Sequence, residues 1–120
     1  MKFCDFYLGS RPIAKKVKYC DTFKLKLVGL MFVKSPGNGA YLPNVKDIHM
    51  NFVRFKLRIL WLDKNLKVVD SKIANTWQLY YGPAGSANVL ELPVENKRKI
   101  KNGDRLRIKI YESSVRKNGS

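Results

Sequence analysis

The chain has 120 residues, with 24 Lys and Arg against 9 Asp and Glu, so its formal net charge is +15 at pH 7. Its length suits one compact domain, and its 45% hydrophobic residues exclude an intrinsically disordered chain. No run approaches the ~20 uncharged apolar residues of a membrane span, and Asp5 interrupts any signal-peptide core. We therefore expect a single domain over residues 1–120, a cytoplasmic location and no membrane partner.

The first third of the chain has weak periodicity. Residues 14–20 alternate apolar and lysine side chains, which predicts an extended strand. Residues 23–28 fit either a strand or a short helical turn capped by Asp21 or Thr22. The composition of residues 35–39, Ser-Pro-Gly-Asn-Gly, predicts a loop.

Two cysteines, Cys4 and Cys20, are too few for a disulfide scaffold and form no CxxC pair for zinc. We favour two small buried side chains, because free Cys is among the residues most often buried. A single bridge between the two segments stays open as the alternative.

The clearest pattern lies in the middle of the chain, where residues 53–59 read Val-Arg-Phe-Lys-Leu-Arg-Ile. Successive side chains of a strand point to opposite faces, so we expect a half-buried strand with Arg54, Lys56 and Arg58 on its outer surface. The pattern becomes wholly apolar at residues 60–62, which predicts cover on both faces at that end of the strand.

Turn residues divide the rest into short strands. Residues 63–65 predict a tight turn before a second strand at 67–70, and residues 80–86 predict a loop. A strand over 89–92 is expected to stop at Pro93.

The C-terminal part repeats the alternation of the central strand. The turn 101–104 contains Gly103, which is free to take positive φ. In the following strand, apolar side chains alternate with Arg105, Arg107 and Lys109. Residues 111–120 are expected to form a frayed tail.

Many short strands separated by Gly, Pro and Asn turns are typical of all-β domains. We therefore predict a mainly β fold, a small single-domain barrel-like or sandwich structure with one or two short helical turns.

Three blocks in register carry a family resemblance. They are Gly-Leu-Met-Phe at 29–32, Ile-His-Met at 48–50 leading into the strand that ends at 62–63, and Ala-Asn-Val-Leu-Glu-Leu-Pro at 87–93, followed by Gly-Asp at 103–104. Together they resemble the domain-of-unknown-function 192 (DUF192) family over about residues 16–110. The resemblance implies a small, mainly β domain with no established enzymatic activity and no agreed ligand.

The chain departs from that family pattern in three places. Arg58 stands where family members usually carry a carboxylate, Val94 replaces the glycine after Leu-Glu-Leu-Pro, and Leu66 occupies the hairpin turn in place of glycine. If the family's carboxylate belongs to a shared site, that site is altered here.

Catalytic signals are thin. The single histidine, His49, has no nucleophile motif around it, the acids are scattered singly, and no phosphate-binding loop motif is present. We therefore predict a non-enzymatic protein with no catalytic residues. His49 with Met50 and Met31 could suggest a soft metal, but the methionines lie among apolar residues typical of a core, so we expect no metal and no cofactor. Glu91 faces away from its neighbours Leu90 and Leu92, and we expect it to pair with a basic side chain.

The charge points to a partner. If the central and C-terminal strands share a sheet, their basic side chains share an outer surface that attracts polyanions with little sequence preference. The predicted polyanion-binding residues are Arg54, Lys56, Arg58, Arg105, Arg107 and Lys109, and the expected partner is nucleic acid, such as a single strand, or another polyanion. Lysine outnumbers arginine 17 to 7, however, so an ordinary solvated exterior also explains the charge.

A second hypothesis uses the aromatic residues of the loop region. Trp77, Tyr80 and Tyr81 lie close in sequence, and clustered aromatic side chains suit sugars and other flat ligands. The alternative function is therefore small-molecule or carbohydrate binding at an aromatic cleft.

Overall fold

The computed structural model describes residues 1–22, 25–26, 29–31 and 33–112. The chain forms nine strands over this part, and the prediction of a mainly β fold is confirmed. The strands are β1 (Lys2–Leu8), β2 (Arg11–Tyr19), β3 (Ala40–Pro43), β4 (Ile48–His49), β5 (Leu57–Leu62), β6 (Val68–Ala74), β7 (Leu79–Tyr80), β8 (Asn88–Pro93) and β9 (Arg107–Glu112).

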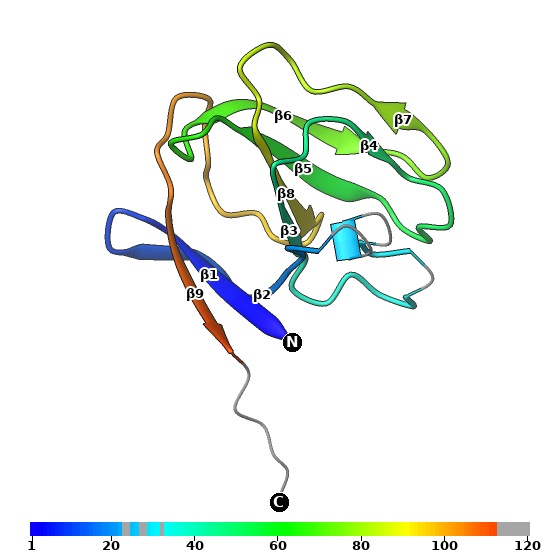
Figure 1. Cartoon of the computed structure of the whole chain (residues 1–120), viewed down its shortest axis with the longest axis horizontal. Helices are drawn as coiled ribbons and strands as arrows, with labels where there is room; N and C mark the ends of the chain where they lie inside the picture. Colours follow the sequence, from blue (N-terminus) through cyan, green and yellow to red (C-terminus); the bar gives the residue numbers. More distant parts are fainter. Residues whose placement is uncertain (23–24, 27–28, 32, 113–120) are drawn as a thin grey trace, which may run out of the picture.

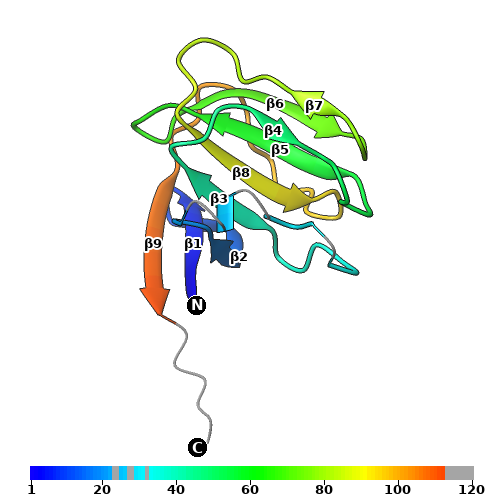
Figure 2. The ribbon, with the colours of Figure 1, turned by 45° about the vertical axis from the view of Figure 1, so that its right-hand side comes forward.

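Seven strands form one sheet in the order β6-β5-β8-β3-β2-β1-β9, and β4 pairs with β7 in a separate ribbon. Every pairing is antiparallel except that of β2 with β3. β1 and β9 lie side by side at one end of the molecule, with the N-terminus on the same side as the end of β9 (Figure 1). Figure 2 shows β5, β6 and β8 together at the other end, with the β4–β7 ribbon beside them.

The sheet bends but does not close into a barrel. A single bridge between Lys67 and Arg105 links the segments that lead into β6 and β9. Backbone hydrogen bonds extend this link, since Val68 N donates to Asp104 O at 2.8 Å and Leu106 N donates to Leu66 O at 2.9 Å. The two edges of the sheet therefore meet at one point.

Two hydrophobic cores lie on opposite faces of the central strands. Side chains of β8 show the division, because Leu90 and Leu92 enter the first core and Val89 enters the second. The first core packs β1 and β2 against β5 and β8, with buried side chains including Cys4, Phe6, Val17, Leu60, Leu62, Leu90 and Leu92. The second core packs the β4–β7 region over the other face, with Leu42, Ile48, Met50, Leu57, Ile59, Trp61 and Val89.

β5 is covered on both faces for most of its length. The prediction that this strand carries a cationic outer surface is therefore wrong. Arg54 and Lys56 are exposed but precede the strand. Arg58 is half-buried, because it shares a face with Leu60 and Leu62, which point into the first core. The expected double cover over residues 60–62 is confirmed, since none of the three side chains is more than 2% exposed.

The segment after β2 makes a helical turn in the part that the structure describes. Lys26 N donates to Thr22 O at 2.9 Å, and Gly29 N donates to Leu25 O at 2.7 Å. Thr22 Oγ1 accepts from Leu25 N at 3.1 Å, so Thr22 rather than Asp21 caps this turn. Residues 23–24 and 27–28, where a strand was the alternative, lie outside the described residues.

Two turns contain a residue with a positive φ angle. Gly103 has φ +94°, as its turn predicts, but Leu66 has φ +65° at the position where glycine was expected. The Leu66 side chain packs against the first core, and its N–H donates to Asp63 O at 3.0 Å. Packing and hydrogen bonding thus hold a non-glycine residue in a left-handed conformation.

The ends of the described chain differ partly from expectation. β9 continues to Glu112, so residues 111–112 are not part of a frayed tail, and residues 113–120 lie outside the described residues. Cys4 and Cys20 are both fully buried free thiols, as favoured from the sequence. None of the helical segments among the described residues is long and apolar enough to cross a membrane.

Candidate functional site

A groove of about 630 Å³ lies beside the β1–β2 hairpin, under the segment that connects β8 to β9. Six basic side chains line it, together with the single carboxylate of Asp104 and the apolar residues Leu8 and Ile100. The six are Arg11, Arg58, Lys97, Arg98, Lys99 and Lys101. We call this set the cationic groove.

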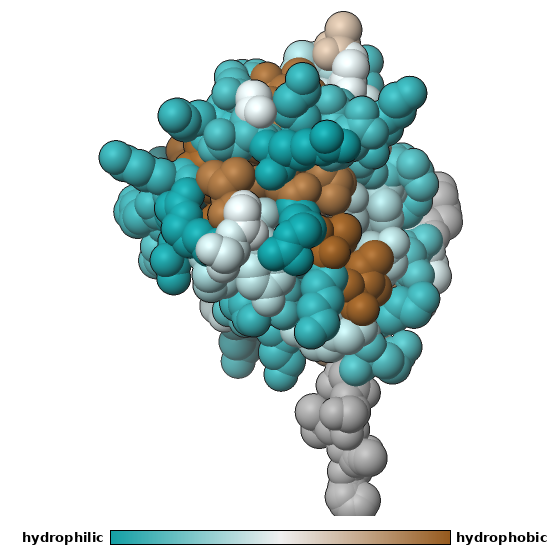
Figure 3. Space-filling view, turned by 90° about the vertical axis from the view of Figure 1, so that its left-hand side faces the viewer, coloured by the Kyte–Doolittle hydropathy of each residue, from teal (hydrophilic) through white to brown (hydrophobic). Residues whose placement is uncertain are grey.

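Figure 3 looks at the side of the molecule that carries β1, β9 and the β8–β9 connection. Hydrophobic surface occupies the centre of this face, and hydrophilic residues surround it. Leu8 and Ile100 are half-buried and pack against the first core, so the groove combines apolar surface with basic side chains.

Backbone carbonyls hold two of the basic groups in place. Arg11 Nη2 donates to Lys99 O at 3.0 Å, and Arg58 Nη1 donates to Asn96 O at 2.8 Å. Both guanidinium groups are therefore held by carbonyl oxygens, and neither forms a salt bridge within the part of the chain that the structure describes. Burial lowers the pKa of Arg58, because desolvation disfavours its charged form.

The connection that supplies the other four cations is fixed by its own hydrogen bonds. Asn96 Nδ2 donates to Ile13 O at 2.9 Å, and its Oδ1 accepts from Arg98 N at 3.1 Å. Asp104 Oδ2 accepts from Lys101 N at 2.8 Å. One oxygen of this carboxylate thus accepts a hydrogen bond from a backbone amide.

The six cations have no ion-pair partner among the described residues. The salt bridges of this part of the chain lie elsewhere, joining the Met1 amino group to Glu112, Lys2 to Asp21, and Lys15 to Asp5. The groove therefore concentrates positive charge that no described carboxylate pairs with at salt-bridge distance, and this excess favours anion binding.

Of the six predicted polyanion-binding residues, Arg58 lines the groove. Arg105 Nε donates to Asn65 O at 3.3 Å, Arg107 Nη2 donates to Gly9 O at 3.0 Å, and Lys109 is exposed on β9. Four strands, β8, β3, β2 and β1, stand between β5 and β9 in the order of the sheet. The two basic segments therefore do not lie on neighbouring strands.

The predicted aromatic residues are spread over different environments. Trp77 is 60% exposed and packs edge-on against Phe52, with the ring centroids 4.8 Å apart. These two residues line a shallow hollow of about 310 Å³. Tyr80 packs against the second core, and Tyr81 is 72% exposed, so neither joins Trp77 in that hollow.

Glu91 is buried on the second-core side of β8, 5% exposed. Burial raises its pKa to about 7, while Lys18 acts in the opposite direction. The expected partner is not found, because no basic group of the described chain lies within salt-bridge distance of its carboxylate.

The possible metal ligands Met31, Met50 and His49 lie in surroundings typical of a hydrophobic core and its edge. Met50 is fully buried, and Met31 is half-buried against the same second core. His49 Nδ1 accepts from Asn51 N at 3.3 Å. Within the described residues, no three His, Cys, Asp or Glu side chains gather as metal ligands would.

Five of the six cations in the groove were not among the predicted site residues, although the sequence contains the basic run at 97–101. The missing information was tertiary, since Arg11, Arg58 and this run come from three separated parts of the chain. The basic run at 97–101 does not alternate regularly with apolar residues as a half-buried strand does, and it follows Pro93, which ends a strand. These two features could have indicated that the cations of the groove lie on the connection before β9 and not on β9 itself.

A family model matches residues 8–108, and it is the DUF192 model, described as "Uncharacterized ACR". A UPF0127 protein of Thermococcus kodakarensis is 36% identical over 85 residues, which cover 66% of this chain and 54% of the relative. A UPF0127 protein of Thermococcus gammatolerans is 33% identical over 84 residues, covering 65% of this chain and 55% of that protein. The chain thus spans about half the length of these curated relatives.

A solved structure shares the fold. It is a protein of unknown function from Novosphingobium aromaticivorans, with a TM-score of 0.67 at 18% sequence identity. The similarity covers 88% of this chain and 83% of the other. It supports the architecture described above and carries no information on a ligand.

Proposed function

The chain belongs to the DUF192 family, whose description assigns no activity, and from this premise we propose that it is a non-enzymatic binding module whose cationic groove takes a polyanion such as single-stranded nucleic acid. The observation that carries the proposal is the set of six basic side chains without ion-pair partners among the described residues. Such a surface gains affinity by releasing counterions from a polyanion.

The geometry favours a flexible strand of phosphates over a rigid duplex. The groove mixes fixed guanidinium groups with exposed lysines on one short connection, which suits a chain that bends to follow them. No aromatic residue is among those that line it, so we expect contacts to phosphates and little preference for base sequence.

Binding to labelled oligouridylate, oligothymidylate and a DNA duplex, followed by fluorescence anisotropy over a salt series, tests the proposal. We expect both single strands to bind, the duplex to bind more weakly, and log affinity to fall linearly with log salt. Each phosphate contact to a single strand contributes about 0.7 to that slope.

Two triple variants with the same net charge separate a site from bulk charge. The groove variant carries Lys97→Gln, Lys99→Gln and Lys101→Gln, and the control carries Lys34→Gln, Lys46→Gln and Lys64→Gln, all at exposed lysines. We expect the groove variant to lose about tenfold in affinity and up to about 2 in slope, and the control to change by less than about twofold. Equal losses in both variants would show that the overall charge, and not the groove, binds the oligonucleotide.

A second candidate function is the binding of a small molecule or carbohydrate at Trp77, without Tyr80 and Tyr81. The exposed Trp77 and its neighbour Phe52 offer aromatic faces for a flat ligand such as a sugar ring, in a hollow that Arg54 and Thr76 also line. Because Trp61 is buried, the tryptophan emission that responds to a surface ligand belongs to Trp77. A shift in this emission with oligosaccharides, absent in Trp77→Phe and absent with oligonucleotides, would favour this second function.

A further inference from the structure

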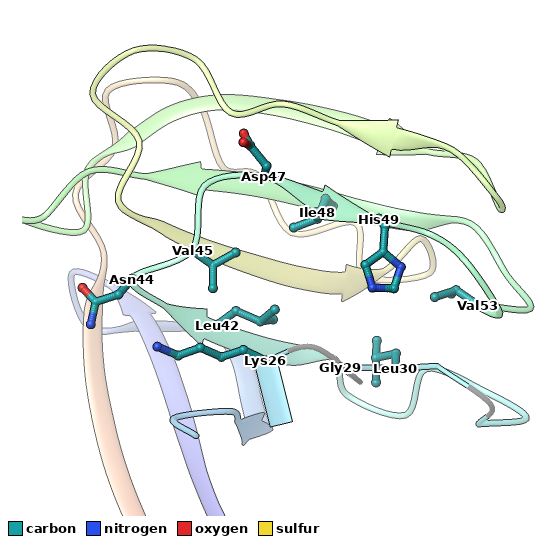
Figure 4. A pocket seen from close by; sticks show the side chains of 10 residues that line it. All are labelled: Lys26, Gly29, Leu30, Leu42, Asn44, Val45, Asp47, Ile48, His49 and Val53. Carbon is teal, nitrogen blue, oxygen red and sulfur yellow. The ribbon is translucent and has the colours of Figure 1, made fainter. Parts of the chain in front are cut away.

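A second concavity of about 430 Å³ lies between β4 and the helical turn after β2, and it shares no lining residue with the cationic groove. Figure 4 shows the side chains that line it, with the His49 ring directed from β4 toward Gly29 and Leu30. Its lining residues are Lys26, Gly29, Leu30, Leu42, Asn44, Val45, Asp47, Ile48, His49 and Val53. We call it the β4 pocket.

The three blocks that carry the family resemblance converge here. Gly29 and Leu30 come from the first block, and Ile48 and His49 come from the second. The third block contributes Glu91 behind the wall, because its Oε1 lies 3.7 Å from the position that a Cβ on Gly29 would take. Segments far apart in the sequence thus line one half-open pocket.

Aliphatic side chains form much of the wall of the β4 pocket. Leu30, Leu42, Ile48 and Val53 are each less than 8% exposed, and they present aliphatic side chains from three different parts of the chain. Buried aliphatic walls in a pocket of this size can hold the apolar body of a small molecule, while the polar groups at its edge set the orientation.

The polar groups favour an anionic head group. Lys26 lines the pocket and has no carboxylate within salt-bridge distance among the residues described. Asp47 does not neutralise it, since Asp47 Oδ1 accepts from Gly82 N at 3.0 Å and its carboxylate points away from Lys26 (Figure 4). An unpaired ammonium beside aliphatic walls attracts a carboxylate whose hydrocarbon chain can fill the space.

We propose that the β4 pocket binds a small aliphatic monocarboxylate, with Lys26 contacting the carboxylate and Leu30, Leu42 and Val53 contacting the hydrocarbon chain. This site is independent of polyanion binding, because none of its residues belongs to the cationic groove.

Three probes with the same hydrocarbon tail and different heads test the proposal. Octanoate, 1-octanol and octylamine are titrated into the isotope-labelled full chain and followed by amide chemical shifts. We expect octanoate to bind about tenfold more tightly than 1-octanol, octylamine to bind weakest, and the largest shifts at residues of the β4 pocket. Octylamine binding as tightly as octanoate, or shifts confined to the Trp77 hollow, would overturn the proposal.

Variants separate the head group from the tail. Lys26→Gln should remove the preference for octanoate while 1-octanol still binds, which shows that the pocket remains folded. Lys34→Gln, at an exposed lysine outside the pocket, should keep the preference. Val45→Trp, which places a large ring at the half-buried wall, should weaken binding of all three probes.

The groove variant of the previous subsection keeps the two sites distinguishable. It should bind octanoate as the parent does, even where it has lost oligonucleotide affinity. An octanoate preference that survives Lys26→Gln but disappears in the groove variant would assign carboxylate binding to the groove and refute the site proposed here.

Discussion

At the scale of single residues, Glu91 is a carboxyl group buried beside the second core. It is a buried carboxyl with a pKa raised to about 7 by desolvation, which Lys18 only partly opposes. The unfolded carboxyl has an ordinary pKa of 4.5. The folded state therefore holds an extra proton between these two values, and its stability declines as pH rises through that window.

We expect Glu91→Gln to flatten this decline, because an amide of the same shape carries no charge to desolvate. The parent should lose on the order of 3 kcal/mol of unfolding free energy between pH 4.5 and 7, and the variant should lose little of it. Urea denaturation at several pH values measures the difference, with Glu95→Gln as a control at an exposed carboxylate. Parallel pH profiles for the parent and Glu91→Gln would contradict the assignment.

Asp5 shows the opposite behaviour at a buried site. Burial opposes ionisation, but hydrogen bonds outweigh it and lower the pKa of Asp5. Its Oδ1 accepts from Lys16 N at 2.8 Å and from the Tyr111 hydroxyl at 2.9 Å, and Lys15 Nζ lies 3.3 Å from Oδ2. This carboxylate thus ties β1 to both of its neighbouring strands.

Asp5→Asn should therefore destabilise the protein by about 1–2 kcal/mol at neutral pH, since the amide loses the charge that these donors stabilise. The pKa of Asp5 is lowered, so its contribution is present above the ordinary value of 3.8 and disappears as pH falls below it. The stability difference between variant and parent should accordingly shrink in acid. Asp70→Asn, whose Oδ1 accepts from Ser71 N, is the control and should cost less.

At the scale of elements, β3 depends on a close approach of two backbones. Lys18 N donates to Gly39 O at 3.2 Å just before β3 begins, and Gly39 has φ +102°. A Cβ on Gly39 would collide with the backbone carbonyl oxygen of Glu91, so β3 can dock on β8 only with glycine there. The short parallel contact between β2 and β3 relies on the same loop.

Gly39→Ala should cost about 3 kcal/mol or more, because backbone strain and a clash with backbone combine. Gly37→Ala is the matched control, since Gly37 also has positive φ, +56°, but a Cβ there meets nothing within 4 Å. Its cost should be about 1 kcal/mol, from the backbone conformation alone. Thermal and urea denaturation of the pair measure the difference, and similar losses would show that the close approach is not limiting.

At the scale of the whole molecule, the net charge of +15 opposes the compact state. The repulsion is strongest where cations crowd together, as the six do around the groove. Neutral side chains around the groove would therefore make the folded protein more stable, whereas a binding surface for anions requires the positive charge.

Melting temperature should therefore rise when NaCl increases from about 0.01 M to about 1 M, as the Debye length falls from roughly 30 Å to about 3 Å. At low salt, the triple change at Lys97, Lys99 and Lys101 should raise the melting temperature more than the control change at Lys34, Lys46 and Lys64. Both remove three positive charges, so a difference between them measures crowding. Equal increases would contradict a local concentration of charge.

The sequence by itself determined that strands lie at 57–62 and 89–92, and it determined the excess of positive charge. It also located turns, because Gly103 and the run at 35–39 fix backbone conformation locally. Alternation reports which side chains are apolar, but it does not report what covers the other face. The fate of Arg58 and the missed strand β1 both depended on such distant partners.

Only the tertiary structure decided where function can reside. Arg11, Arg58 and the basic connection meet at one groove, and the turn at Gly29 lies beside β4 and beside Glu91 of β8. The physical reason is that strand pairing and layer packing act between segments far apart in the chain, whereas periodicity and turn chemistry act between neighbours.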